Sequence, residues 1–311
     1  MKIVFIDQNV YKDFAHKIEI IDPLKALGEV TAFDDLPVPD EELYSRASDA
    51  DVIILSIHQL RNGLIERFRN LKLIQFMGIG YRNYMDEEFC ASKGIKALGI
   101  GEYGSNAVAE YALGLALSLL RGICEADRRL KREVWDMQGL LGGEIAGSTF
   151  GIVGTGAIGR LVAEKATKLG ARVIATDLVV NRKLVDEFGV EYVDLPTLFK
   201  NSNIVSCHLT YTKATEKLVS RELLSSMKPE AFFVNTSRAQ VVDYEALYEL
   251  LRDKRIRGAA LDVHMSEPPE DYSLSRLENV IATPHLGYYT EKALENQLRK
   301  VVESVVANIG K

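Results

Sequence analysis

The sequence predicts an α/β protein with two domains, each built on a doubly wound parallel sheet. Three observations support this fold class. Short apolar runs alternate with helix-like stretches in both halves of the chain, as they do when helices cover both faces of a parallel sheet. A length of 311 residues suggests two domains rather than one. In the segment 149–160, an apolar strand runs into a glycine turn and then into a helix.

The first half of the chain has the alternation of a small α/β domain. Its expected strands cover residues 2–6, 29–33, 51–56, 71–76 and 96–98. Helical stretches separate these strands, before residue 29 and at 41–47, 63–68 and 85–93. The glycines of 78–80 break the chain directly after the fourth strand.

The middle of the chain begins with an expected helix at 105–120 that is apolar nearly all round, apart from Glu110. Such a helix is expected to lie buried between layers or at an interface. A charged, exposed helix is expected at 125–135. A glycine-rich loop at 138–147 then leads into the strand before the glycine turn.

The second half repeats the alternation. Its expected strands cover 150–153, 172–176, 203–209, 231–235, 258–263 and 279–282. Its expected helices cover 157–169, 194–200, 220–227, 243–253 and 290–309. Ligands of open α/β sheets bind beyond the carboxyl ends of the strands. The glycine and polar residues expected at those ends are 78–80, 154–159, Asp177, His208, Thr236, Ser237, Arg238, Asp262 and His285.

The glycine turn has the spacing of a dinucleotide-binding motif. Gly154 permits the tight turn, Gly156 lets the backbone approach a pyrophosphate, and Gly159 allows helix and strand to pack closely. The pyrophosphate is expected at the helix N-terminus, beside the amides of Ala157 and Ile158, where unpaired N–H groups and the helix dipole favour negative charge. The alternative is a tight turn that binds no ligand.

An acidic residue follows the second strand of this βαβ unit. Asp177 is expected to accept hydrogen bonds from the adenosine ribose hydroxyls and to repel a 2′-phosphate. The residues directly after it, Leu178 and Val179, are apolar, although Arg182 is near. The sequence therefore favours NAD over NADP as the cofactor.

The composition argues against several classes of partner. The net charge of −6 gives no general attraction to nucleic acid or to an anionic membrane. The three cysteines are widely spaced, which suggests a reducing compartment and no structural metal. The N-terminus is expected to be a strand rather than a signal peptide, and the longest apolar run, 111–120, is too short to span a bilayer. We therefore expect a cytoplasmic protein.

Four segments, at 144–159, 234–243, 258–268 and 283–287, together resemble the D-isomer-specific 2-hydroxyacid dehydrogenases. They occur in the family's order and spacing, and the resemblance covers nearly the whole chain. It implies a Rossmann NAD-binding domain, at 99–287, inserted into a smaller flavodoxin-like substrate domain, at 1–98 and 288–311. It also implies that the helix from Ser105 is a hinge and dimer helix, and that the protein is a homodimer.

The resemblance further implies the roles of the site residues. Arg238 matches the arginine that holds the substrate's carboxylate and carbonyl, a task that suits the planar guanidinium fork. His285 matches the general acid/base, and Glu267 matches the acid that pairs with it and favours its charged form. The backbone N–H groups of Ile79 and Gly80 match the loop that receives the substrate carboxylate.

Four further residues are expected to line the cofactor. Asp262 matches the aspartate near the nicotinamide carboxamide, and Thr236 and Ser237 follow the strand that leads to Arg238. His208 is interpreted as structural or cofactor-lining rather than catalytic, and His264 as structural. Taken singly, Arg238 is also compatible with a solvated surface arginine, and Glu267 and His285 with turn residues.

The chain departs from the family pattern at a few positions near these residues. Ala239 stands where glycine usually follows the arginine, so a slightly different backbone is expected there. Arg82 replaces a common aspartate, which suggests a surface salt bridge or, alternatively, a contact with an anionic substrate. Tyr288 and Tyr289 replace small residues after the histidine and are candidates to line the pocket.

The expected function is the interconversion of a 2-oxo acid and a D-2-hydroxy acid by hydride transfer with NAD, with His285 as the general acid/base. The sequence does not identify which 2-hydroxy acid is used. The alternative is an NADH-sensing binding protein of the corepressor type, with little or no turnover. A small-molecule substrate, a homodimer, and no nucleic acid, membrane or metal partner complete the expectation.

Overall fold

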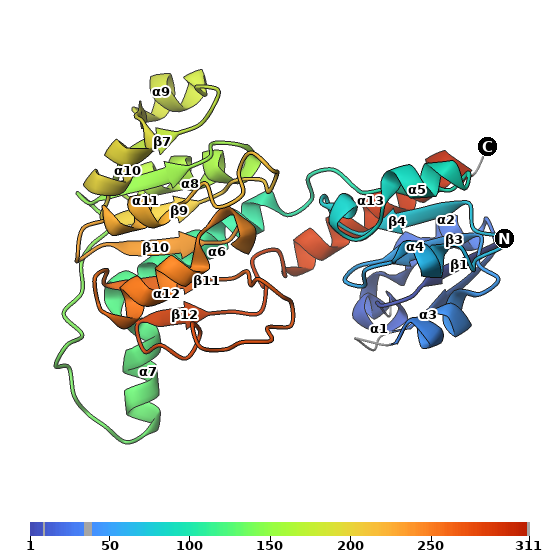
Figure 1. Ribbon diagram of the computed structural model, residues 1–311, viewed down its shortest axis with the longest axis horizontal. Helices are drawn as coiled ribbons and strands as arrows, with labels where there is room; N and C mark the ends of the chain where they lie inside the picture. Colours follow the sequence, from blue (N-terminus) through green and yellow to red (C-terminus); the bar gives the residue numbers. More distant parts are fainter. Residues whose placement is uncertain (9, 34–38, 310–311) are drawn as a thin grey trace. The chain divides into compact units, whose positions relative to one another are not determined.

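The computed structural model describes residues 1–8, 10–33 and 39–309. The chain divides into two compact units, Met1–Gly104 with Thr290–Lys311, and Ser105–Tyr289 (Figure 1). The sequence placed the boundaries a few residues earlier, after residues 98 and 287. The difference at the first boundary has a packing reason, because Ile100 is buried in the core of the first unit. At the second boundary, Tyr288 packs edge-on against His285 of the second unit.

Within its described residues, the first unit is a five-stranded parallel sheet in the order β2-β1-β3-β4-β5. Its strands are β1 (Lys2–Phe5), β2 (Glu29–Ala32), β3 (Val52–Leu55), β4 (Leu73–Phe76) and β5 (Lys96–Leu98). Its helices are α1 (Val10–Asp13), η1 (Ala15–Ile21), α2 (Asp22–Lys25), α3 (Asp40–Ala47), α4 (Asn62–Ile65), η2 (Tyr81–Asn83), α5 (Glu87–Ser92) and α13 (Glu291–Ile309).

The central strands β3 and β4 are buried on both faces of this sheet, which explains why they are mostly apolar. Alternate residues of β3 point to opposite faces: Ile53 packs in one core cluster, whereas Val52 and Ile54 pack in the other. The C-terminal helix α13 contributes Leu298 and Val301 to the second cluster. The chain therefore returns to complete the core of its first unit, as expected for an inserted second domain.

All of residues 105–289 are described, and they form a seven-stranded parallel sheet in the order β12-β11-β10-β9-β6-β7-β8. The strands are β6 (Thr149–Val153), β7 (Arg172–Thr176), β8 (Glu191–Tyr192), β9 (Ile204–Cys207), β10 (Phe232–Asn235), β11 (Gly258–Leu261) and β12 (Val280–Ala282). The helices are α6 (Ser105–Arg121), α7 (Ile123–Lys131), α8 (Ala157–Lys168), α9 (Arg182–Phe188), α10 (Leu195–Asn201), α11 (Arg221–Ser225), η3 (Ala239–Val241) and α12 (Tyr244–Arg252).

The strand order of the second unit reverses direction between β6 and β9, which pair directly. Successive strands are added outward on one side of β6 up to β8, and the chain then crosses to the other side at β9. The carboxyl ends of β6 and β9, where the strand order reverses, are the usual ligand position in this architecture. Helices α6 and α8 cover one face, and α10, α11 and α12 cover the other.

Helix α7 is shorter than expected, because it ends at Lys131 rather than at residue 135. Glu133 adopts a left-handed backbone with φ of 62°, which stops the helix. The Arg129 side chain donates to the carbonyl oxygens of Asp136 and Gln138, at 3.2 and 2.7 Å, and holds the following turn. Figure 1 shows α7 projecting beyond β12 of the same unit.

No single helix among the described residues has the length and apolar character needed to cross a membrane. Helices α6 and α7 reach that length and composition only as a pair bent by 63°.

The glycine turn after β6 depends on close backbone packing. Gly154 has a φ of 90°, a conformation that side chains with a Cβ rarely adopt. A Cβ atom at Gly159, in the first turn of α8, would overlap the carbonyl oxygen of Gly154. The spacing of these two glycines is therefore required by the fold itself.

We predict that Gly159→Ala lowers the Tm of the second unit by about 3–8 °C, because a backbone atom cannot move aside as a side chain can. Gly63→Ala in α4 is the matched control, since a Cβ there meets no atom within 4 Å. Its Tm should stay unchanged or rise slightly, because alanine favours a helix over glycine. Differential scanning calorimetry of both variants would measure this, and equal Tm values would contradict the packing argument.

Candidate active site

The glycine turn opens onto free space at the N-terminus of α8. Gly156 caps this 12-residue helix without a side-chain hydrogen bond, and a Cβ added at Gly156 would meet no atom within 4 Å. The first-turn amides, which include those of Ala157 and Ile158, have no partner within the helix. Unpaired N–H groups that face open space are suited to an anionic group such as a pyrophosphate.

Asp177 lies at the end of β7 and is bound to the glycine turn. Its Oδ2 accepts from the backbone N–H of Thr155 at 2.6 Å and from the Thr155 hydroxyl at 3.1 Å. Its Oδ1 accepts from the N–H of Leu178 at 2.6 Å. Tyr192 donates its hydroxyl to Thr155 Oγ1 at 2.8 Å and so supports the same corner. The carboxylate is held beside the turn, where its charge would disfavour a 2′-phosphate; the preference for NAD over NADP stays a prediction.

Two buried polar atoms of the fully described second unit lack hydrogen-bond partners, and both belong to predicted cofactor residues. They are Nδ1 of His208, after β9, and Oγ1 of Thr236, after β10. Buried polar groups nearly always have partners, so these two atoms fit a site that a polar ligand completes. Burial lowers the pKa of His208 to about 3, so its ring is neutral at physiological pH. Its Nε2 lies 2.9 Å from Ser206 Oγ.

Ser237 differs from its neighbour Thr236. Its hydroxyl donates inward to Asn235 Oδ1 at 2.8 Å, and its backbone N–H donates to the same oxygen at 3.0 Å. The structure therefore gives the Ser237 side chain a role in shaping the turn after β10. A contact between Ser237 and the cofactor stays a prediction.

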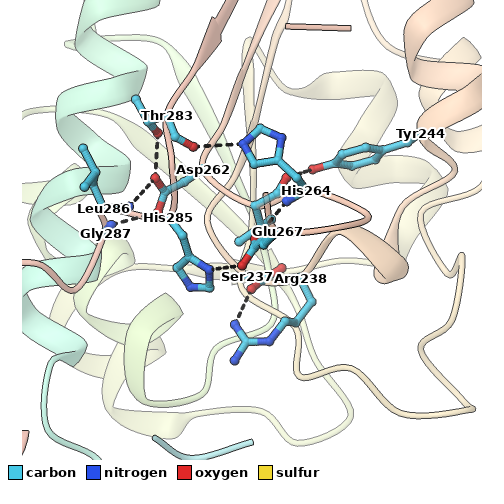
Figure 2. Close-up of polar contacts among 11 residues, drawn as sticks. Ser237, Arg238, Tyr244, Asp262, His264, Glu267, Thr283, His285, Leu286 and Gly287 are labelled. Carbon is cyan, nitrogen blue, oxygen red and sulfur yellow. Dashed lines mark hydrogen bonds and ion pairs between the residues drawn. The ribbon is translucent and has the colours of Figure 1, made fainter. Parts of the chain in front are cut away.

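Glu267 and His285 form a hydrogen-bonded pair, as the resemblance implied. His285 Nδ1 lies 2.7 Å from Glu267 Oε2, and each side chain is about one third exposed (Figure 2). The carboxylate can only accept, so Nδ1 carries the hydrogen and Nε2 remains for exchange with a ligand. Burial by itself would raise the pKa of Glu267. The hydrogen bond and charge of His285, the N–H of His264 and the nearby Arg238 together outweigh burial and lower that pKa below its ordinary value.

His285 is held in an unusual backbone conformation by Asp262. The φ of His285 is 57°, in the left-handed region that non-glycine residues seldom occupy. Asp262, after β11, accepts from Thr283 Oγ1 at 2.6 Å and from the backbone N–H groups of Leu286 and Gly287, both at 2.8 Å. Its own carbonyl oxygen accepts from the N–H of His285 at 2.9 Å. Asp262 thus anchors the loop 283–287; its proximity to a nicotinamide stays a prediction.

Arg238 follows β10 in an extended conformation and starts the short helix η3. Its Nη1 donates to the carbonyl oxygen of Ser237 at 2.7 Å, and its own carbonyl accepts from Asn235 Nδ2 at 3.0 Å. Its charge helps to lower the pKa of Glu267, so the cation lies close to the Glu267–His285 pair. Figure 2 shows Arg238 and His285 gathered around Glu267. Ala239, the departure from glycine, lies inside η3 and is not among the residues with positive φ, so alanine fits there.

Three supporting residues were not singled out from the sequence. Asn235 donates to Tyr244 Oη at 3.3 Å, and Tyr244 donates to the carbonyl oxygen of Val263 at 2.8 Å. Thr283 binds Asp262 through its hydroxyl. A role for Asn235 could have been predicted from the sequence, because it is a polar residue that ends a strand otherwise made of phenylalanine and valine.

The predicted substrate loop belongs to the first unit. Ile79 is 59% exposed, and the carbonyl oxygen of Gly80 accepts from the N–H of Asn83 at 3.1 Å at the start of η2. Arg82 forms an exposed salt bridge with Glu87 at 2.7 Å, the simpler of its two interpretations. Among residues 1–8, 10–33 and 39–309, no group of three or more histidine, cysteine, aspartate or glutamate side chains is arranged to hold a metal ion.

Comparisons with known proteins agree with this arrangement. Residues 113–287 match the sequence model of the D-isomer specific 2-hydroxyacid dehydrogenase, NAD binding domain. The hydroxypyruvate reductase of Thermotoga maritima is 36% identical over 306 residues, which are 95% of this chain and 99% of that protein. The D-3-phosphoglycerate dehydrogenase of Methanocaldococcus jannaschii is 36% identical over 308 residues, 94% of this chain but only 58% of the longer relative.

A solved structure, the D-lactate dehydrogenase from Aquifex aeolicus complexed with NAD and lactic acid, has a TM-score of 0.84 and 29% identity to this chain. The match covers 100% of this chain and 96% of that one. The protein therefore belongs to the D-isomer specific 2-hydroxyacid dehydrogenase family and is an NAD(P)-dependent oxidoreductase with an NAD-binding domain that includes residues 113–287.

Proposed function

We propose that this protein reduces a short 2-oxo acid to the corresponding D-2-hydroxy acid, with NADH as the cofactor and His285 as the acid. The observation that carries the proposal is the 2.7 Å pair between His285 Nδ1 and Glu267 Oε2, beside Arg238. The bound nicotinamide would supply the hydride. Support for a short substrate comes from the relatives, which are named for hydroxypyruvate, glyoxylate and phosphoglycerate.

Each residue of this group has a defined task in the proposed reaction. Arg238 uses one N–H on the carbonyl of Ser237 and keeps the rest of its guanidinium fork for the substrate's carboxylate and carbonyl oxygens. His285 donates the Nε2 proton to the oxygen that becomes the hydroxyl. Glu267 fixes the ring through Nδ1 and stabilises its charged form. A contact of the N–H groups of Ile79 and Gly80, in the first unit, with the substrate carboxylate stays a prediction from the resemblance.

The cofactor would be held by the glycine turn, with the pyrophosphate over Gly156 and the amides of Ala157 and Ile158. Asp177 would bind the adenosine ribose. His208 Nδ1 and Thr236 Oγ1 are the two buried side-chain atoms of the second unit, residues 105–289, that lack protein partners and would gain one from the cofactor.

An NADH-sensing protein without turnover is not favoured. The acid/base pair and the arginine are all present, and the relatives named above are dehydrogenases or reductases.

We predict that the protein oxidises NADH with glyoxylate, hydroxypyruvate or pyruvate, and more slowly with branched or aromatic 2-oxo acids. Absorbance at the NADH band would measure this. Tight NADH binding with no turnover on any of these acids would favour the sensor instead.

The His285→Gln variant provides the control for this assay. General acid catalysis contributes about 10²–10⁴-fold, so kcat should fall by that factor while NADH still binds. Glutamine keeps an amide near the ring position without a group that titrates near neutrality. An unchanged kcat would remove His285 from its proposed role.

We predict that Glu267→Gln moves the pH dependence of reduction to lower pH. The pKa of Glu267 lies below its ordinary value, so the carboxylate is charged at neutral pH and favours protonated His285. Reduction consumes a proton from the ring, so activity is lost as pH rises. Without the negative charge, that loss should occur at a lower pH. A profile of kcat/KM between pH 5 and 9 would show it, and coincident profiles for both enzymes would contradict the pairing.

We further propose that the protein is a homodimer. Three large apolar side chains after α7, those of Trp135, Met137 and Leu141, are 87%, 81% and 87% exposed in the single chain. Apolar side chains concentrated on one projecting segment are typical of an interface.

We predict that the double variant Met137→Asp/Leu141→Asp is monomeric by light scattering, whereas Val179→Asp, at another exposed apolar position, keeps the wild-type mass. A monomeric wild type would contradict this proposal.

A further inference from the structure

We propose that His264 is a positioning residue for the Glu267–His285 pair, because its backbone and its imidazole join the two segments that carry those side chains. The inference rests on the proposed role of His285 as the acid. His264 has no assigned part in that chemistry, and the sequence suggested only a structural one.

His264 completes a closed ring of contacts around the pair (Figure 2). Its backbone N–H donates to Glu267 Oε1 at 3.1 Å. Its ring Nε2 lies 3.0 Å from the carbonyl oxygen of Thr283, two residues before His285. Glu267 Oε2 and His285 Nδ1 close the ring at 2.7 Å. His264 therefore contacts both Glu267 and Thr283, which lies at the end of β12 two residues before His285.

The ring contact defines the role of the His264 imidazole. A carbonyl oxygen only accepts, so Nε2 of His264 must carry a hydrogen and donate it to Thr283. This holds for the neutral Nε2–H form and for the charged ring alike. The imidazole acts here as a fixed donor and not as a proton carrier.

The segment that carries Glu267 is packed against the core in its second half, through Leu274 and Leu277, whereas the half that carries Glu267 has few other attachments. Residues 264–279, between Val263 and β12, contain no helix or strand. Tyr244 holds the start of this segment by donating to the carbonyl oxygen of Val263. The loop of His285 is anchored separately, by Asp262. The imidazole of His264 is thus a direct link between two loops that must keep their spacing for the pair to persist.

The charged and titratable groups around the pair come from several elements of the second unit. They are Arg238 after β10, Asp262 after β11, Tyr244 on α12, Tyr111 on α6, which interacts with Thr283 and Asp262, and Tyr288, whose ring meets that of His285 edge-on at 5.9 Å. None of them is altered by substitution of His264. The backbone N–H to Glu267 also survives substitution, so a change of side chain tests the link to Thr283 alone.

The test compares His264→Phe with His264→Gln. Phenylalanine keeps a ring but has no donor, whereas glutamine places an amide N–H near the position of Nε2. In His264→Phe, kcat for reduction should fall on the order of tenfold, the equivalent of about one lost hydrogen bond. Its kcat/KM profile should shift to lower pH, toward that of Glu267→Gln, with the KM for NADH within about twofold of wild type. In His264→Gln, both kcat and the pH profile of kcat/KM should be close to those of the wild-type enzyme. His16→Phe, in η1 of the first unit, is the control.

A third variant isolates the route of the effect. In the Glu267→Gln background, His264→Phe should lower kcat far less than it does in the wild-type enzyme. The interaction that the His264 imidazole supports is already absent from that background. A wild-type profile in His264→Phe, or equal losses in Phe and Gln variants without a pH shift, would overturn the inference. If His285→Gln keeps its kcat, the proposed function fails instead. The double-variant comparison uses folded enzymes whose NADH binding is checked first, so instability of one variant does not decide it.

Discussion

The site depends on one buried carboxylate that does no proposed chemistry. Asp262 accepts from a hydroxyl and two backbone N–H groups of the segment 283–287, and its carbonyl accepts from a third N–H. A residue such as His285 with a left-handed backbone costs about 1–3 kcal/mol. Hydrogen bonds to charged groups contribute about 1.5–3 kcal/mol each, so the three to the carboxylate outweigh that strain. The unusual φ of His285 is therefore a stable feature of the loop, and it aims the imidazole at Glu267.

The sheet explains why these groups meet. Arg238, Asp262 and His285 follow the neighbouring parallel strands β10, β11 and β12, whose carboxyl ends lie along one edge. Parallel pairing brings segments far apart in the chain to the same edge, so a short loop after each strand is enough to bring the side chains together. The glycine turn after β6 and His208 after β9 lie on the same edge of the same sheet.

The sequence predicted the parts of the fold and of the site that depend on local chemistry. The spacing of Gly154 and Gly159 indicated the turn, because both positions are constrained within one βαβ unit. The alternating apolar runs predicted the parallel sheets. The two-residue strand β8 was missed because so short a strand has no periodicity to read. The early end of α7 was also missed, because the left-handed backbone of Glu133 that stops the helix has no marker in the local sequence.

In the site, the resemblance implied the pair of Glu267 and His285, but not what holds it. The anchoring role of Asp262 and the link through His264 depend on which loops come side by side, and neither is visible in local sequence. His264 illustrates the limit, because one histidine among five carries no signal of its partners. Only the arrangement of β11 and β12 as neighbours places its ring against Thr283.

The two carboxylates of this region show how environment divides their tasks. Asp262 is buried, and its donors are backbone groups and a hydroxyl, none of which titrates near neutrality. It holds the loop 283–287 through donors whose charge does not change near neutral pH. Glu267 is about one third exposed and its partner is an imidazole, so its interaction changes whenever that ring gains or loses a proton. A pair that exchanges protons with a ligand must stay accessible to that ligand. The same exposure weakens the hydrogen bond between Glu267 and His285, so the bond alone holds the two side chains less firmly. The fixed geometry of the pair therefore comes from a neighbouring buried group, Asp262, which holds the loop of His285.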